Sequence, residues 1–321
     1  MWRVAAAEVQ SGETTSRRTS VSNLLAMPPR ADVLLMAIGV LAVSTSGPLM
    51  AAIVAPALAV AMWRNALALL AIWPTALLRR RPELRALSRR ELTWAVGGGV
   101  LLAGHLGTWV PSLHFTSVAS ATALVCTQPL WVALIARAMG HHVPRRTWVG
   151  MAVAFVGVML LTGVDLSLSP RALAGDLLAV LGGLFAAFYT VASAEVRKSV
   201  STTTYTAICY STAGLLLFGV CLGAGIQTTG FSDRTWLQLA ALTLGAPLLG
   251  HSVFNVVLRS TSATVVSLVL LLEVPGAAII AALTLGQTPP IAAVPAAVLL
   301  LVGLGIVISS GGSGDQPSLP D

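Results

Sequence analysis

Long apolar blocks, separated by short polar stretches, run along almost the whole chain. A segment that crosses the hydrocarbon core of a membrane needs about 20 mostly apolar residues. Windows of about 19 residues predict spans over residues 33–53, 57–78, 92–113, 117–138, 147–164, 175–194, 204–224, 236–257, 262–284 and 290–309. The pattern therefore predicts an all-α integral membrane protein with ten transmembrane helices.

The composition agrees with this class. Charged residues make up 10% of the chain and hydrophobic residues 56%, whereas a soluble domain is roughly 25% charged. Residues 1–30 are polar, and residues 311–321 are rich in Gly, Ser and Pro, so both segments are predicted to be flexible cytoplasmic tails. The three cysteines stand singly in apolar stretches and predict neither a disulfide nor a metal site.

The basic residues fall mostly on one side of the predicted membrane. With the N-terminus in the cytoplasm, sixteen of the nineteen Lys and Arg residues are cytoplasmic, Arg171 and Arg234 lie on the other side, and Arg64 lies within a span. Cytoplasmic loops of membrane proteins carry such an excess. The split predicts a multi-pass protein of the cytoplasmic (inner) membrane with both termini inside. The net charge of +7 is then a topology signal and does not indicate nucleic acid as a partner.

The two halves of the chain repeat the same order of short motifs. The first half contains Gly104-His105, Thr116-Ser117, Gln128-Pro129 and Gly140-His141, and the second contains Gly250-His251, Thr261-Ser262, Glu273-Val274-Pro275 and Gly286-Gln287. Matched motifs begin 145 or 146 positions apart. Because each half holds an odd number of spans, the second enters the membrane from the opposite side. Residues 31–165 and 174–310 are therefore predicted to form two inverted five-helix repeats (5+5), as in many secondary transporters.

Further residues extend the likeness between the halves. Gly99–Asp165 contains Thr-Ser-Val-Ala-Ser-Ala at the opening of span four, and Gly175–Gly311 contains Leu-Leu-Glu-Val-Pro-Gly in span nine. This doubled order of motifs resembles the EamA repeat of the drug/metabolite transporter superfamily, and Arg64 is similar to the arginine usual in that family's second span. The resemblance implies a secondary transporter.

The chain departs from the family pattern at three positions. His141 and Gln287 stand where an acidic residue usually follows the glycine that ends spans four and nine, and Val274 separates the family's Glu-Pro pair. The two end positions are interpreted as helix-end or loop contacts rather than substrate contacts.

Glu273 and Arg64 are the charged residues predicted deep inside the membrane. A carboxylate at the bilayer centre costs several kcal/mol unless it is paired, protonated or facing water. Glu273 either binds a substrate ammonium or couples transport to protons, or it is a hydrogen-bonded carboxyl that holds the kink at Pro275. Arg64 either binds a substrate carboxylate or pairs with Glu273 or a helix end.

Other polar side chains within spans are weaker candidates. His105 and His251 occupy matched places and could relay protons or join helices. A zinc site is not predicted, because no acidic residue or cysteine stands at ligand spacing from either histidine. Trp109, Gln128, Tyr189 and Asn255 suit either a pocket for a small amphipathic solute or helix packing. Ser44 and Ser46, in the break before Pro48, either line a path or satisfy a simple proline kink.

Small residues on two spans suit close helix contact, and would also allow a homodimer through small-residue helix faces: Gly150, Gly157, Gly303 and Gly305. The predicted partners are a small-molecule substrate and the lipid bilayer, with no cofactor.

The sequence as a whole predicts a secondary transporter, an exporter of a small metabolite such as an amino acid or a drug-like compound, and not an enzyme. The loops are too short for an ATPase domain, so the energy must come from a gradient or from the substrate itself. Two alternatives stay open, a non-transporting membrane assembly or signalling subunit and, less favoured, an intramembrane enzyme.

Overall fold

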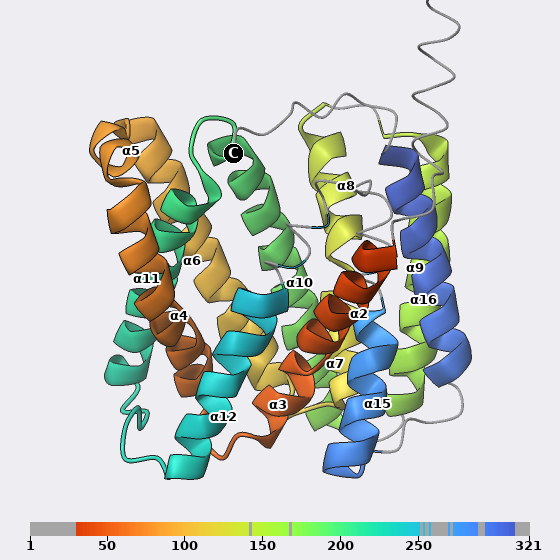
Figure 1. Cartoon of the computed structure of the whole chain (residues 1–321). Coiled ribbons are helices and arrows are strands. Elements are labelled where there is room, and N and C mark those ends of the chain that lie inside the picture. The colour runs from red at the N-terminus through yellow and green to blue at the C-terminus, as the bar shows by residue number, and fades with distance from the viewer. Residues whose placement is uncertain are drawn as a thin grey trace, which may run out of the picture.

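The computed structural model of the chain describes residues 30–140, 143–166, 169–250, 253, 257, 269, 272–287 and 293–311. These residues form a bundle of helices and no strand (Figure 1). The helices of the first half are α2 (Arg30–Ser44), α3 (Ser46–Ala52), α4 (Ala57–Arg79), α5 (Arg81–Ala86), α6 (Arg89–Ser112), α7 (Val118–Val125), α8 (Gln128–Ala138) and α9 (Arg145–Leu166). The second half contains α10 (Pro170–Val196), α11 (Thr202–Gly223), α12 (Asp233–Thr243), the π-helical turn η1 (Leu244–Gly250), α15 (Glu273–Leu285) and α16 (Ala293–Gly311).

The helices follow the predicted spans closely. Each predicted span coincides with at least part of one helix or of two consecutive ones. Among the described helices, α5 is the short one that lies between spans. Within the described residues, five helical segments are long and apolar enough to cross a membrane: Asp32–Ala52, Ala57–Arg79, Val118–Ala138, Pro170–Ser193 and Thr202–Gly223. The segments Glu273–Leu285 and Val294–Gly303 are apolar but shorter.

Several helices start where a serine satisfies the free backbone N–H groups of the first turn. The side chain of the residue before the helix accepts a hydrogen bond from the backbone N–H three residues later in α6, α7, α10, α11 and α12, the residues being Ser88, Ser117, Ser169, Ser201 and Ser232. At the other end of α15, Gly286 takes a positive φ of 66°, which favours glycine and stops the helix. Local chemistry therefore sets these helix ends.

Two long helical stretches are interrupted inside the bundle, and α15 begins directly after a turn. The break between α2 and α3 falls at Thr45, and the break between α7 and α8 falls at Cys126 and Thr127. α15 begins at Glu273, after a turn at Leu272. The starts of α8 and α15 are 145 positions apart, which is the offset of the sequence motifs. The helix starts at Gln128 and Glu273 thus lie at matched positions of the two halves, whereas the break at Thr45 has no counterpart in the continuous α10.

The packing between the halves joins corresponding helices. α9 packs on α16, α4 on α11, and α7 on α15. α6 packs on α10 and α11, and the matched stretch of the second half, α12 with η1, packs on α2 and α4. The two halves therefore use the same set of contacts in exchanged roles.

Glycines bring α9 and α16 into backbone contact. A Cβ added to Gly303 would lie 2.3 Å from the backbone N of Ala154 and 2.5 Å from the carbonyl oxygen of Gly150. A Cβ at Gly157 would lie 2.7 Å from the backbone N of Leu300. Three of the glycines singled out for close contact thus serve packing inside the chain, and a homodimer through small-residue faces stays a prediction.

The loops with basic residues gather at one end of the bundle. Figure 1 places α5, the carboxyl end of α8 and the turn between α10 and α11 together at the top, here called the basic end. The start of α12 and the end of α15 lie at the opposite end. The basic and non-basic loops that alternate along the sequence thus lie at opposite ends of the bundle.

Candidate functional site

Glu273 and Arg64 occupy neighbouring places inside the bundle without forming an ion pair. Glu273 is the first residue of α15, at the helix interruption, and its side chain is half-buried. Arg64 lies on α4, also half-buried, and the two charges act on each other electrostatically. None of the ion pairs among the described residues joins them. The direct pair considered from the sequence is therefore absent in this conformation.

One nitrogen of the Arg64 guanidinium is buried without a hydrogen-bond partner among the described residues. This atom, Nη1, is inaccessible to solvent. Tyr210 of α11 and Tyr189 of α10 lie within its electrostatic reach. A buried donor without a partner costs about 1–3 kcal/mol, and more when it is charged. A hydrogen-bond acceptor or an anion that binds next to Arg64 would therefore remove this cost.

His105 is fixed between α6 and α10. Its Nδ1 lies 2.9 Å from the carbonyl oxygen of Gly182, and because a carbonyl only accepts, Nδ1 carries the proton. In the neutral ring Nε2 is then left as an acceptor. The ring stacks on Trp109, with the centroids 5.4 Å apart, and also interacts electrostatically with Arg64. The indole Nε1 of Trp109 is buried without a partner in the described structure.

Gln128 and Tyr189 each make a contact with a neighbouring helix near the interruption between α7 and α8. Gln128, the first residue of α8, donates from Nε2 to Oγ1 of Thr190 at 2.5 Å. Tyr189 precedes Thr190 on α10 and stacks on Tyr205 of α11, with the centroids 6.3 Å apart. The amide of Gln128 is thus oriented from α10.

Ser44 and Ser46 flank the break between α2 and α3. Both are buried, and neither hydroxyl has a hydrogen-bond partner among the described residues. Thr45, between them, donates from its hydroxyl to the carbonyl of Ala42 at 2.7 Å. Ser44 lies against α15, because a Cβ on Gly276 would come within 2.9 Å of the Ser44 Cβ. Of the three residues at this break, Thr45 is thus the one whose hydroxyl satisfies a backbone carbonyl of α2.

Two of the predicted site residues, His251 and Asn255, lie outside the described residues. The residues around Arg64 and Glu273 described above are here called the central cluster. It also includes three residues that the sequence did not single out: Tyr210, Thr190 and Cys126. Cys126 interacts electrostatically with Glu273. Cys126 and Thr190 carry no pattern that would have separated them from packing residues. The cluster is thus built from α4, α6, α8, α10, α11 and α15 of both halves.

Gln287 makes a helix-end contact between the halves. Its Oε1 accepts a hydrogen bond of 3.0 Å from the backbone N of Val118, at the start of α7. This geometry fits the interpretation of the position as a helix-end contact. It ties the end of α15 to the start of α7 at the end of the bundle away from α5.

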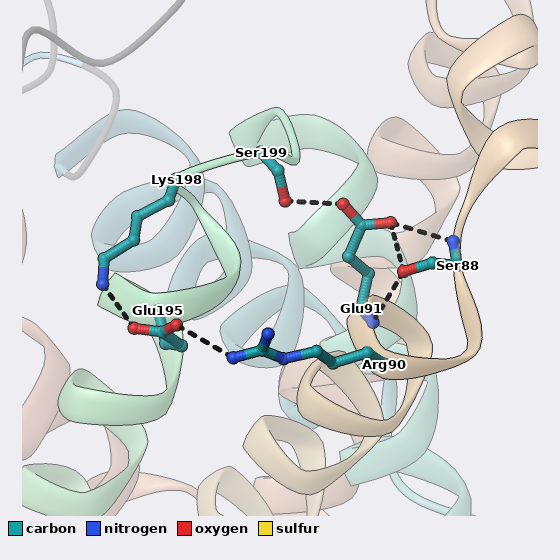
Figure 2. A network of polar contacts seen from close by, with 6 residues as sticks. All are labelled: Ser88, Arg90, Glu91, Glu195, Lys198 and Ser199. Atoms are coloured by element: carbon teal, nitrogen blue, oxygen red, sulfur yellow. Dashed lines mark hydrogen bonds and ion pairs between the residues drawn. The ribbon is translucent and has the colours of Figure 1, made fainter.

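A second polar network lies at the basic end and is drawn in Figure 2. Glu91 accepts hydrogen bonds from the hydroxyl of Ser199 at 2.5 Å and from the backbone N and hydroxyl of Ser88, both at 2.8 Å. Glu195 accepts from Lys198 at 2.5 Å and lies 3.6 Å from Arg90. The network joins the start of α6 to the end of α10 and the turn that follows.

The acidic members of this end are held in their charged form. The hydrogen bond from Ser199, followed by those from Ser88, lowers the pKa of Glu91 below its ordinary value. For Glu83 on α5, partial burial alone would raise the pKa, but hydrogen bonds from the backbone N and hydroxyl of Ser201 outweigh it and lower the pKa. Both carboxylates thus act as fixed anions against α10 and α11.

Two hollows lie outside the central cluster. One of about 330 Å³ runs between α4 and α11 and is lined mainly by apolar side chains such as Met62, Trp63, Leu215 and Phe218. The other, of about 300 Å³, is lined by the network of Figure 2 together with Trp94 and Val196. Neither of these two hollows is lined by Arg64 or Glu273.

Comparison with known proteins gives consistent matches. A family model described as the EamA-like transporter family matches residues 31–163 and 173–309. A curated relative from Archaeoglobus fulgidus, named an uncharacterized transporter, is 25% identical over 181 residues, which are 56% of this chain and 62% of the relative. A crystal structure of another protein shares the fold with a TM-score of 0.60 at 18% identity, over 86% of this chain and 96% of that one. Because the family model covers both halves in two consecutive copies, the chain belongs to the EamA-like transporter family.

Proposed function

We propose that this protein is a secondary transporter that exports a small metabolite, such as an amino acid or a drug-like compound, by alternating access. The observation that carries the proposal is the buried Nη1 of Arg64, which has no partner among the described residues and lies in electrostatic reach of Glu273, the first residue of α15. Interrupted helices in matched positions of two repeats are where carriers build their binding sites. A ligand with an anionic group would satisfy Arg64.

The proposed architecture is ten transmembrane helices in two inverted repeats, with both termini in the cytoplasm. The exchanged contacts of the two halves support the inversion, since a pseudo-twofold axis in the membrane plane would produce them. The collection of basic loops at one end supports a cytoplasmic basic end. The cytoplasmic membrane is the proposed location.

The side chains take distinct proposed roles. Arg64 binds the anionic group of the substrate, and Glu273 binds an ammonium or carries the coupling proton. Nε2 of His105 is free to accept a hydrogen bond, and Trp109 offers a buried indole N–H. The amide of Gln128 and the ring of Tyr189 complete a wall of polar and aromatic groups.

Flux into proteoliposomes across a panel of amino acids, polyamines, nucleosides and toxic natural products tests the proposal. Substrate-saturable movement is expected for the wild type. Glu273→Gln is expected to abolish it or to remove its pH dependence while the protein stays folded, and Asp233→Asn, an exposed acid at the start of α12, is the matched control. Unchanged and still pH-dependent flux in Glu273→Gln would defeat the coupling role. Absence of saturable movement for every compound would favour an assembly subunit or an enzyme instead.

A further inference from the structure

The hollow at the basic end has walls of both charges. Arg90 and Lys198 contribute two cations, and Glu91 and Glu195 contribute two carboxylates, so the charges of the lining cancel. The hydroxyl-bearing residues Ser88 and Ser199 lie beside them in Figure 2. A site for a simple anion would present an excess of cations, and this one does not.

The cations keep most of their hydrogen-bonding capacity. The side chains of Arg90 and Lys198 are 79% and 64% exposed, and each contacts a single carboxylate, that of Glu195. A guanidinium has five N–H donors and an ammonium has three. Free donors therefore face the hollow next to carboxylates that stay charged.

The helix ends around the hollow have opposite polarity. The hollow lies between the start of α6 and the end of α10. A helix start favours negative charge and a helix end favours positive charge. A ligand with a phosphate and an ammonium a few ångströms apart would match both ends at once.

The hollow also lies where the polar end of the bundle meets its apolar surface. Trp94, which lines the hollow, is 41% exposed, and tryptophan is enriched at membrane interfaces. One turn further along α6, a Cβ added to Gly97 would meet nothing within 4 Å. On α10, the exposed side chains of Phe188 and Leu181 precede Glu195 by seven and fourteen residues, so all three lie on the same face of the helix. An apolar strip thus leads away from the charged hollow.

We propose that this hollow binds the headgroup of an aminophospholipid of the phosphatidylethanolamine type. The phosphate accepts from Arg90 and Lys198, and the primary ammonium donates to Glu195 and Glu91. An acyl chain runs along the strip at Gly97 and Phe188. A purely anionic headgroup would leave two carboxylates facing an anion, and a choline headgroup has no ammonium N–H to donate.

The test is lipid binding by the purified full-length protein, freed of native lipid, measured by native mass spectrometry and by thermal unfolding. Lipids with ethanolamine, glycerol and choline headgroups and the same acyl chains are titrated in turn. The ethanolamine lipid is expected to bind saturably and about tenfold more tightly than the other two, as the gain of charged hydrogen bonds implies. Binding is read without transport, so its failure leaves the proposed function standing.

Two variants with matched controls locate the site. Glu195→Gln is expected to lower the affinity for the ethanolamine lipid about tenfold but not that for the glycerol lipid, and Arg90→Gln is expected to weaken both. Asp233→Asn and Arg146→Gln, exposed residues away from the hollow, are expected to change neither. Tighter binding of the glycerol lipid, equal losses in the controls, or equally tight binding of free phosphoethanolamine would each overturn the proposal. Melting without lipid separates a folding defect from lost binding, and Lys198→Gln repeats the test if Arg90→Gln is unstable.

Discussion

Replacing Gly303 by alanine should separate α16 from α9. The added Cβ would lie 2.3 Å from the backbone N of Ala154 and 2.5 Å from the carbonyl oxygen of Gly150. Both obstacles are backbone atoms of a helix, so no side chain can rotate to make room. To restore an ordinary contact of about 3.4 Å, the helices must move apart by about 1 Å.

The expected loss follows from this displacement. Overpacking a close contact costs about 1–3 kcal/mol, and close approach of backbones is itself a main source of helix association in lipid. We expect Gly303→Ala to lower the free energy of unfolding by about 2–3 kcal/mol. Unfolding of the purified protein in mixed micelles of increasing denaturing detergent, followed by circular dichroism, measures this loss.

Gly219→Ala is the matched control for this experiment. Gly219 lies within α11, and an added Cβ there meets nothing within 4 Å. Alanine in an open helical position should change the free energy of unfolding by no more than about 1 kcal/mol, in the stabilising direction. If both variants unfold alike, the backbone contact of α9 and α16 does not contribute as argued.

Two further predictions concern a helix contact and the response to acid. Gly276→Ala should destabilise the protein because the new Cβ would press on Ser44, and adding Ser44→Gly should restore much of the loss; a double-mutant cycle without coupling would contradict this. The lowered pKa of Glu91 means that its contribution is complete above the ordinary value of 4.5 and is lost as the pH falls through the lowered value. Wild-type melting temperatures should therefore fall more steeply than those of Glu91→Gln between about pH 6 and about pH 3, and parallel curves would exclude the effect.

The helices could be predicted well because the membrane demands long apolar segments. The division between the first two predicted spans, 33–53 and 57–78, is confirmed, since Pro56 stands directly before α4. α9 ends and α10 begins close to the gap between the two predicted repeats, residues 31–165 and 174–310. Hydropathy could not foresee that α7 and α8 are separate, since an interruption at Cys126 leaves the apolar run intact.

The site was predictable only as far as charge and polarity stand out in apolar segments. Arg64 and Glu273 were conspicuous for that reason, yet their separation depends on how α4 and α15 are placed by other helices. The pattern Ser88-x-x-Glu91 is a recognisable start of a helix. The pattern does not reveal that Glu91 also accepts a hydrogen bond from Ser199, 108 positions away. Such a long-range contact depends on how the helices pack and has no signature in the local sequence.

The π-helical turn η1 makes the two copies unequal. From the capping Ser88 to His105 the chain advances 17 positions, and from the matched Ser232 to His251 it advances 19. A π turn holds more residues than an α turn, so η1 can take up surplus residues without a longer helix. α6 has no such turn. The two copies therefore cannot fully exchange their conformations. In the proposed alternating-access cycle, the inward-open and outward-open forms would then differ in free energy, so that one of them is the resting state.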